Sequence, residues 1–116
     1  MSETVLDASA LIAYLKEEPG GETVAPLIPD AVISAVNMAE VVTRMTEDGF
    51  TAEQARAVIA DTSVNVVTFD ESLAIATGLL RDTTRHLGLS LGDRACLALA
   101  GKLGVPALTA DRRKLP

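Results

Sequence analysis

The stretch VLDASALIAYL, from Val5 to Leu15, is almost wholly apolar except for one carboxylate, that of Asp7. Residues 3–7 are typical of a short buried strand, because Val and Leu lie at their centre. After Asp7, four apolar residues recur at the spacing of one helical face: Ala8, Leu11, Ile12 and Leu15. The stretch therefore predicts a strand followed at once by a helix, with a charged side chain at the junction.

The alternation of strand and helix continues along the chain. Further strands are expected at residues 31–35, 64–69 and 106–110, and VNVVTF at 64–69 is the clearest because it is β-branched and uncharged. Helices are expected over residues 22–28, 38–48, 51–62, 70–85 and 90–103. This order predicts an α/β fold with a doubly wound parallel sheet of about four strands flanked by helices, in one domain spanning residues 1–116.

Several residues mark where these helices begin and end. Thr51 with Gln54 forms the pattern of a capping box, and Asp70 is well placed to cap the helix after the third strand. Ser90 begins the last helix, and Gly104 supplies its C-terminal stop.

The composition narrows the class of protein. Hydrophobic residues make up 48% of the chain but aromatic residues only 3%, so the core must consist of Ala, Val, Leu and Ile. We find neither an apolar run long enough to span a membrane nor a basic and apolar leader, and therefore expect a cytoplasmic protein without a membrane partner. The single cysteine, Cys96, fits a reducing compartment and is expected to fill the core.

The net charge of −6 conceals an asymmetry along the chain. Residues 1–80 hold three basic and thirteen acidic residues, whereas residues 81–116 hold seven basic and three acidic ones. The basic residues of this last third are candidates for contacts to a phosphate backbone, in particular Arg94, Arg112 and Arg113. On charge alone, ordinary solvated helix faces are an equally good interpretation.

Four acidic residues stand at the ends of predicted elements: Asp7, Glu40, Asp93 and Asp111. If the sheet is doubly wound, its strands' carboxyl ends meet at one edge, and all four side chains should converge there. Each also has a purely structural interpretation: Asp7 can cap a helix, Asp111 can sit in a turn, and Asn37–Glu40 and Ser90–Asp93 both fit a capping box. Glu40 can in addition pair with Arg44, four residues on.

Convergence would favour a metal site. Carboxylates crowded together repel one another, and a hard divalent cation removes that conflict. Oxygen ligands without His or Cys suit Mg²⁺ or Mn²⁺, and such an ion can polarise a phosphoryl oxygen for hydrolysis. The acids therefore point to metal-dependent chemistry on phosphorus.

Four segments carry a resemblance to a known family: VLDASALIAYL, ISAVNMAEVVTRM, LSLGDRACLALA and LTADR. In order and spacing they resemble the motif blocks of PIN-domain ribonucleases, most closely the VapC-type toxins of bacterial and archaeal toxin–antitoxin pairs. The resemblance spans nearly the whole chain. It implies that Asp7, Glu40, Asp93 and Asp111 bind one or two Mg²⁺ or Mn²⁺ ions and support hydrolytic cleavage of RNA.

The resemblance has further implications. Ser9 and Thr109 match the small hydroxyl positions beside the first and last acids, where hydroxyls orient ligands or water. Family membership also implies a homodimer and a cognate antitoxin that blocks the acidic pocket with a basic side chain. The chain departs from the family pattern after the TADR block, where a final edge strand is expected and is missing.

Other classes of protein fit less well. A receiver domain would use Asp70 as phosphoacceptor. Such a domain also requires paired acids after the first strand and a lysine directly after the last, and this sequence has neither. A haloacid-dehalogenase-type phosphatase needs an acid where Ser9 stands, and a Ser/His/Asp site would depend on His86, which is expected at a helix end on the surface. A PIN-like module that binds a partner or RNA without cutting remains the principal alternative.

The basic C-terminal residues yield a prediction. Charge reversal at Arg112 and Arg113 should weaken RNA binding more at low salt than at high salt, because phosphate contacts release counterions. Titration of labelled RNA across a salt series measures this, and binding that is unchanged across the series would reject it.

Overall fold

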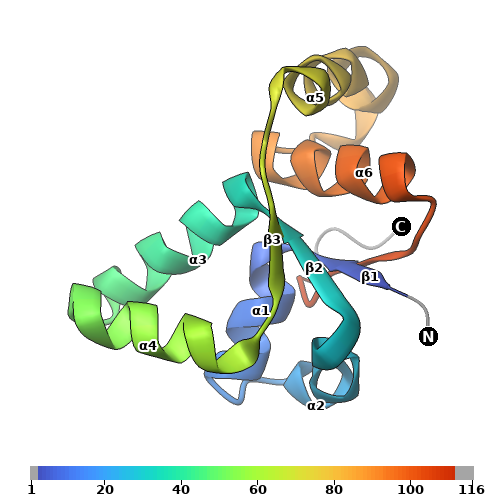
Figure 1. The fold of residues 1–116 in the computed structure, drawn as a ribbon. Coiled ribbons are helices and arrows are strands. Elements are labelled where there is room, and N and C mark those ends of the chain that lie inside the picture. The colour runs from blue at the N-terminus through green and yellow to red at the C-terminus, as the bar shows by residue number, and fades with distance from the viewer. Residues whose placement is uncertain (1–2, 112–116) are drawn as a thin grey trace.

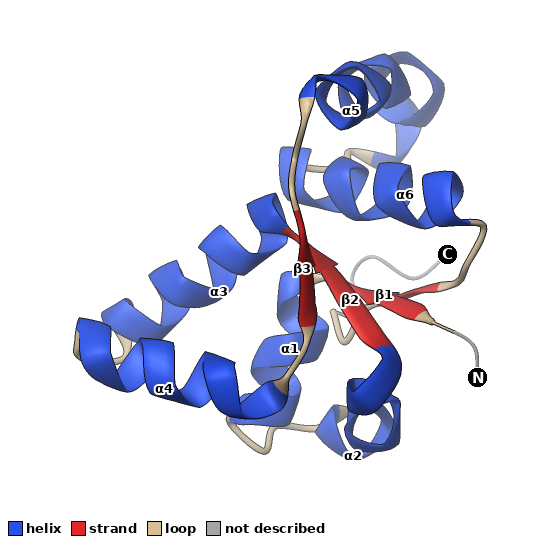
Figure 2. Ribbon diagram, viewed as in Figure 1, coloured by secondary structure: helices blue, strands red, loops and turns tan. Residues whose placement is uncertain are grey.

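The computed structural model describes residues 3–111, and at its centre is a four-stranded sheet (Figure 2). The strands are β1 (Thr4–Leu6), β2 (Ala31–Ser34), β3 (Asn65–Val67) and β4 (Ala107–Leu108). All pairings are parallel, in the order β3-β2-β1-β4. The predicted α/β fold with about four parallel strands is confirmed. The expectation that a final edge strand is missing concerns residues outside the described range. Arg112 and Arg113 also lie outside it.

Helices cover both faces of this sheet (Figure 1). Helices α5 and α6 lie on one face, and helices α1 to α4 lie on the other. Their bounds are α1 Ala8–Leu15, α2 Gly21–Val24, α3 Ala35–Glu47, α4 Ala52–Thr62, α5 Glu71–Thr84 and α6 Leu91–Leu103, with two 3₁₀ helices, η1 Ala25–Asp30 and η2 Arg85–Leu87. None of the helices in residues 3–111 has the length and apolar character needed to cross a bilayer.

The two-sided sheet follows from the alternation of side chains along each strand. Val5 and Val32 pack against α5 and α6, where Cys96 is also buried as expected. The next residues in register, Leu6 and Ile33, point to the opposite face and pack against α1 to α4. Both central strands are therefore apolar on each face, and full burial of a Leu or Ile side chain contributes about 1.5–3 kcal/mol.

The helix ends follow the predicted signals closely. Thr51 and Gln54 form a complete capping box at α4, and Asp70 caps α5 by accepting a hydrogen bond from the Leu73 amide at 2.9 Å. Gly104 ends α6 in the left-handed conformation, with φ of +67°. These predictions are confirmed because a capping residue forms its hydrogen bond with the helix that it begins or ends.

One cap was predicted wrongly. The Asn37–Glu40 pair does not form a capping box, because α3 begins earlier: Ser34 is its cap and accepts a hydrogen bond from the Val36 amide at 3.2 Å. Strand β2 runs directly into the helix at Ser34, so Asn37 lies within the helix and is buried.

Some predicted elements are shorter than expected. The clearest predicted strand, 64–69, forms only the three residues of β3, because its sole partner β2 ends at Ser34, which pairs with Val67. Strand β4 likewise keeps two of five expected residues. The helix expected at 22–28 is divided between α2 and η1, where Pro26 and Pro29 cannot donate main-chain hydrogen bonds.

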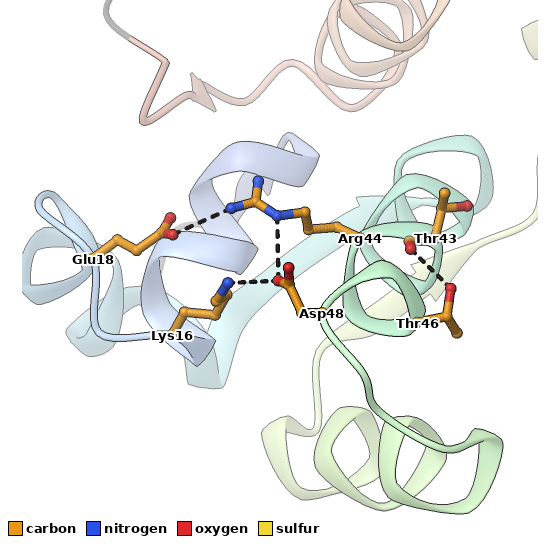
Figure 3. A network of polar contacts seen from close by, with 6 residues as sticks. All are labelled: Lys16, Glu18, Thr43, Arg44, Thr46 and Asp48. Carbon is orange, nitrogen blue, oxygen red and sulfur yellow. Dashed lines mark hydrogen bonds and ion pairs between the residues drawn. The ribbon is translucent and has the colours of Figure 1, made fainter.

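A network of ion pairs joins the ends of α1 and α3 (Figure 3). Asp48 pairs with Lys16 and with Arg44 Nε at 3.3 Å, and Arg44 also reaches Glu18 at 3.5 Å. The expected pairing of Arg44 with Glu40 is therefore replaced by these two partners. The hydrogen bond from Lys16, with the nearby charges of Lys16 and Arg44, lowers the pKa of Asp48 below its usual 3.8, and burial opposes this only in part.

This network makes stability depend on pH. Because the folded-state pKa of Asp48 is lowered, its contribution is complete above the ordinary value and is lost as the pH falls through the folded-state value. We predict that Asp48→Asn lowers Tm by about 1–4 °C at pH 7, and that this difference shrinks as the pH falls below the ordinary Asp value of 3.8. Thermal unfolding from pH 7 to pH 2.5 measures it, with Glu47→Gln as control. A difference as large at pH 2.5 as at pH 7 would contradict the assignment.

Candidate functional site

Asp7 is fixed at the carboxyl end of a central strand. Its main-chain amide donates to the Leu108 carbonyl oxygen at 3.1 Å, so it continues the pairing of β1 with β4. Its side chain is only 4% exposed and caps α1, with Oδ1 accepting hydrogen bonds from the Ala10 amide at 2.9 Å and from Ser9 Oγ at 2.7 Å. The carboxylate is thus buried and held in one orientation, and a buried carboxylate must have such partners.

A chain of hydroxyl groups links Asp7 to the last strand. Ser9 Oγ lies 3.0 Å from Thr109 Oγ1, and it also accepts a hydrogen bond from the Ala110 amide at 3.0 Å. Ser9 has one hydroxyl proton, which it donates to Asp7, so Thr109 is the donor between the two hydroxyls. Thr109 Oγ1 in turn accepts from the Asp111 amide at 3.1 Å. The first and last sequence motifs therefore form one polar network.

Asp93 faces the same cavity as Asp7. It lies in the first turn of α6 and completes the predicted capping box with Ser90, whose amide donates to Oδ2 at 2.9 Å. Asp7 and Asp93 both line a cavity of about 270 Å³, together with Leu89, Cys96, Leu97, Ala107, Leu108 and Thr109. As the helical spacing predicted, Asp93 shares a largely apolar surrounding with Cys96.

Glu40 lies against the start of the same helix, α6. Its Oε1 accepts a hydrogen bond from Asn37 Nδ2 at 2.8 Å, and this amide nitrogen also donates to the Gly92 carbonyl oxygen at 3.0 Å. A Cβ atom at Gly92 would lie only 2.4 Å from Glu40 Oε1, so glycine permits the close approach. Glu40 lines a neighbouring cavity of about 470 Å³ with Ser9, Arg44 and Ala110.

The four acids lie near one edge of the sheet without forming one cluster. Across residues 3–111, no three Asp, Glu, His or Cys side chains are gathered closely enough to hold a metal ion. Asp7, Glu40 and Asp93 instead each accept hydrogen bonds from nearby N–H or O–H groups. The oxygen atoms present, from carboxylates and hydroxyls, are of the kind that Mg²⁺ or Mn²⁺ prefers as ligands. The residues therefore fit a hard cation, although they are not prearranged around one.

Arg94, a candidate RNA contact, is directed toward the interior. Its Nη1 donates to the Thr77 carbonyl oxygen in α5 at 3.1 Å, and no hydrogen-bond partner in the described residues reaches its buried Nε. This geometry favours a role in joining α5 to α6. Arg112 and Arg113 lie outside the described residues.

Sequence reasoning missed two residues that place Glu40. Asn37 was interpreted as a helix cap and Gly92 was not singled out, but both contact the carboxylate from different helices. The only available signal was a polar residue on the side of α3 that carries buried Val41 and Met45.

A further cavity lies elsewhere, between α1, α2 and α4. It encloses about 540 Å³, and apolar side chains of Tyr14, Leu15 and Val58 line it. Four acids share the lining: Glu17, Glu18, Glu22 and Asp61. The lining of this cavity therefore combines apolar surface with four acidic side chains.

Comparison with known proteins agrees with this fold. The family model of the PIN domain matches residues 4–115, and the chain belongs to the PIN-domain family. No curated protein matches the chain by sequence.

Three solved structures share the fold. The structure of Mycobacterium tuberculosis VapC20, titled a sarcin–ricin loop cleaving toxin, has a TM-score of 0.76 and 19% identity over 94% of this chain and 90% of that chain. DNA-bound VapBC from Salmonella typhimurium has a TM-score of 0.74 and 23% identity over 97% and 90%. VapBC-1 from nontypeable Haemophilus influenzae has a TM-score of 0.69 and 24% identity over 97% and 89%.

The hydroxyl network yields a stability prediction. Ser9→Ala should lower the free energy of unfolding by about 1–3 kcal/mol, because Asp7 Oδ1 and the Ala110 amide both lose a partner. Urea unfolding measures this, with the exposed Thr46→Ala on α3 as control, expected to cost less than about 0.5 kcal/mol. Equal effects of the two substitutions would show that the network contributes little.

Proposed function

We propose that this PIN domain is a metal-dependent endoribonuclease, the toxin of a VapC-type toxin–antitoxin pair. The observation that carries the proposal is the shared cavity of Asp7 and Asp93, two carboxylates held on separate elements at the carboxyl end of a parallel sheet. In sheets of this type, ligands bind at that end of the strands. The proposed reaction is hydrolysis of RNA phosphodiester bonds.

The proposed roles follow from the positions of the acids. Asp7, Glu40, Asp93 and Asp111 would hold Mg²⁺ or Mn²⁺, which when bound polarises a phosphoryl oxygen and lowers the pKa of water. Ser9 and Thr109 orient the Asp7 carboxylate and the Asp111 main chain through their hydroxyl groups. Asp7 is 4% exposed and shares its cavity with Cys96, Leu97 and Leu108, so little bulk water contacts it.

The proposal includes an antitoxin, a second copy of the chain, and the cytoplasm as the place of action. Two of the structures that share the fold are titled as VapBC complexes, which supports a protein partner. The acidic cavity between α1, α2 and α4 would suit a partner that carries basic and apolar side chains. Exposed apolar side chains of α5, such as Ile75 and Leu79, support self-association.

A second candidate is a PIN-like module that binds RNA or a partner without cutting. The observation that favours it is the dispersed arrangement of the acids, since no three of them gather within residues 3–111. The same residues would then serve as helix caps and polar anchors only.

The decisive test is cleavage of total cellular RNA by the purified chain with and without Mn²⁺. We predict metal-dependent cutting that falls at least about 100-fold in Asp7→Asn and in Asp93→Asn, because each substitution removes a charge from the shared cavity. Asp82→Asn is the matched control, since this aspartate is exposed on α5 and should leave the rate unchanged.

Two outcomes would contradict the nuclease. Cutting that survives in both substituted chains would come from a contaminating enzyme. No cutting by a folded wild-type chain that also fails to bind Mn²⁺ would favour the binding module.

A further inference from the structure

Asn37 is an uncharged polar side chain buried where an apolar one would be expected. It lies in α3 with 1% of its surface exposed, on the same side of the helix as buried Val41 and Met45. It does not cap the helix, because Ser34 does. Its burial therefore needs another explanation, since an amide is costly to remove from water.

The hydrogen bonds of Asn37 connect two helices. Nδ2 donates to Glu40 Oε1 at 2.8 Å within α3 and to the Gly92 carbonyl oxygen at 3.0 Å in α6. Both partners are acceptors only, so the amide nitrogen rather than its oxygen must face them. One side chain thus sets where the Glu40 carboxylate lies relative to the first turn of α6.

The oxygen of the same amide shows what this arrangement costs. Asn37 Oδ1 is buried, and no hydrogen-bond donor of residues 3–111 reaches it. Leucine would remove this unsatisfied oxygen, but it would also take away the hydrogen bonds that Asn37 donates to Glu40 Oε1 and to the Gly92 carbonyl. The benefit of asparagine at this position therefore lies in these two bonds, to Glu40 and to α6.

Gly92 leaves room for the Glu40 carboxylate beside α6. Any Cβ at this position would lie within 2.7 Å of both Glu40 carboxylate oxygens, so the carboxylate occupies the space that a side chain would fill. Asp93 follows Gly92 directly and faces the cavity that it shares with Asp7. The contact places Glu40 beside the element that carries Asp93.

We infer that Asn37 is a positioning residue, which holds the Glu40 carboxylate against α6 so that it lies beside Asp93 at the acidic site. The inference rests on the proposed function, because it assigns the purpose of the contact to metal binding at that site. Asn37 itself contacts neither metal nor RNA in this scheme. It acts through Glu40 alone, and this distinguishes it from a residue that supports the core.

The test compares Asn37→Leu in the wild-type and Glu40→Gln backgrounds. The measurements are the Kd for Mn²⁺, by titration calorimetry, and the midpoint of urea unfolding. In the wild-type background the Kd should rise about 10–100-fold, as is typical when the partner of a metal ligand is removed. In the Glu40→Gln background the same substitution should change the Kd less than about 2-fold, because its target is already lost.

The stability readout separates positioning from a structural role. The urea midpoint of Asn37→Leu should fall in both backgrounds, because the buried Gly92 carbonyl oxygen loses its donor in each, whereas the Kd should rise only where Glu40 is intact. An equal rise in Kd in both backgrounds, or a loss of Mn²⁺ affinity that only follows a loss of stability, would overturn the inference.

A second pair of variants keeps the test informative if Asn37→Leu does not fold. Gly92→Ala displaces the Glu40 carboxylate without altering the core, and it should raise the Kd only where Glu40 is intact. Gly101→Ala is its control, because nothing lies within 4 Å of the added carbon. An unchanged Kd in Gly92→Ala would overturn the inference.

Failure of the proposed function would show itself separately. If wild-type Mn²⁺ binding depends on Asp7 and Glu40 but not on Asn37, the inference alone is wrong. If the folded wild type does not bind Mn²⁺, both are wrong.

Discussion

The structure depends on the burial of one carboxylate at the end of a central strand. Asp7 is 4% exposed, and two donors that reach Oδ1 stabilise a charge in that position. One donor is the first turn of α1, so the helix must begin immediately after β1. The other is Ser9, whose hydroxyl is held by the segment that follows β4. Helix start, strand pairing and the candidate site are thus set by one requirement, the satisfaction of a buried charge.

The acids of the site show that structural and chemical roles are compatible in one side chain. Asp7 caps α1 and Asp93 completes the capping box of α6, yet both face the same cavity. A carboxylate at a helix N-terminus is stabilised by the main-chain amides, so the cap places a charge without a separate scaffold. Finding a structural explanation for such a residue therefore does not exclude a chemical one.

Local signals predicted most of the fold, and long-range contacts account for what they missed. The strand at Asp7, the caps at Thr51 and Asp70 and the stop at Gly104 depend on neighbouring residues, so spacing and residue type were sufficient. The length of β3 depends on where its partner β2 ends, which no property of VNVVTF reveals. At the site, the order of strands and helices placed Asp7 and Asp93 at the same edge of the sheet, and both line one cavity. The contact of Asn37 with Gly92, 55 residues away, could not be predicted, because it depends on how α3 packs against α6.

The bond between Ser9 and Thr109 joins residues 100 positions apart, and this separation has a consequence for biosynthesis. A nascent chain can form β1, α1 and β2 early, but the hydroxyl network around Asp7 stays incomplete until residues 107–111 have been made and have paired with β1. Contacts of such long range form late in folding. The surroundings of Asp7 are therefore completed by residues about 100 positions further along the chain, so a translation product that stops before them lacks the finished site.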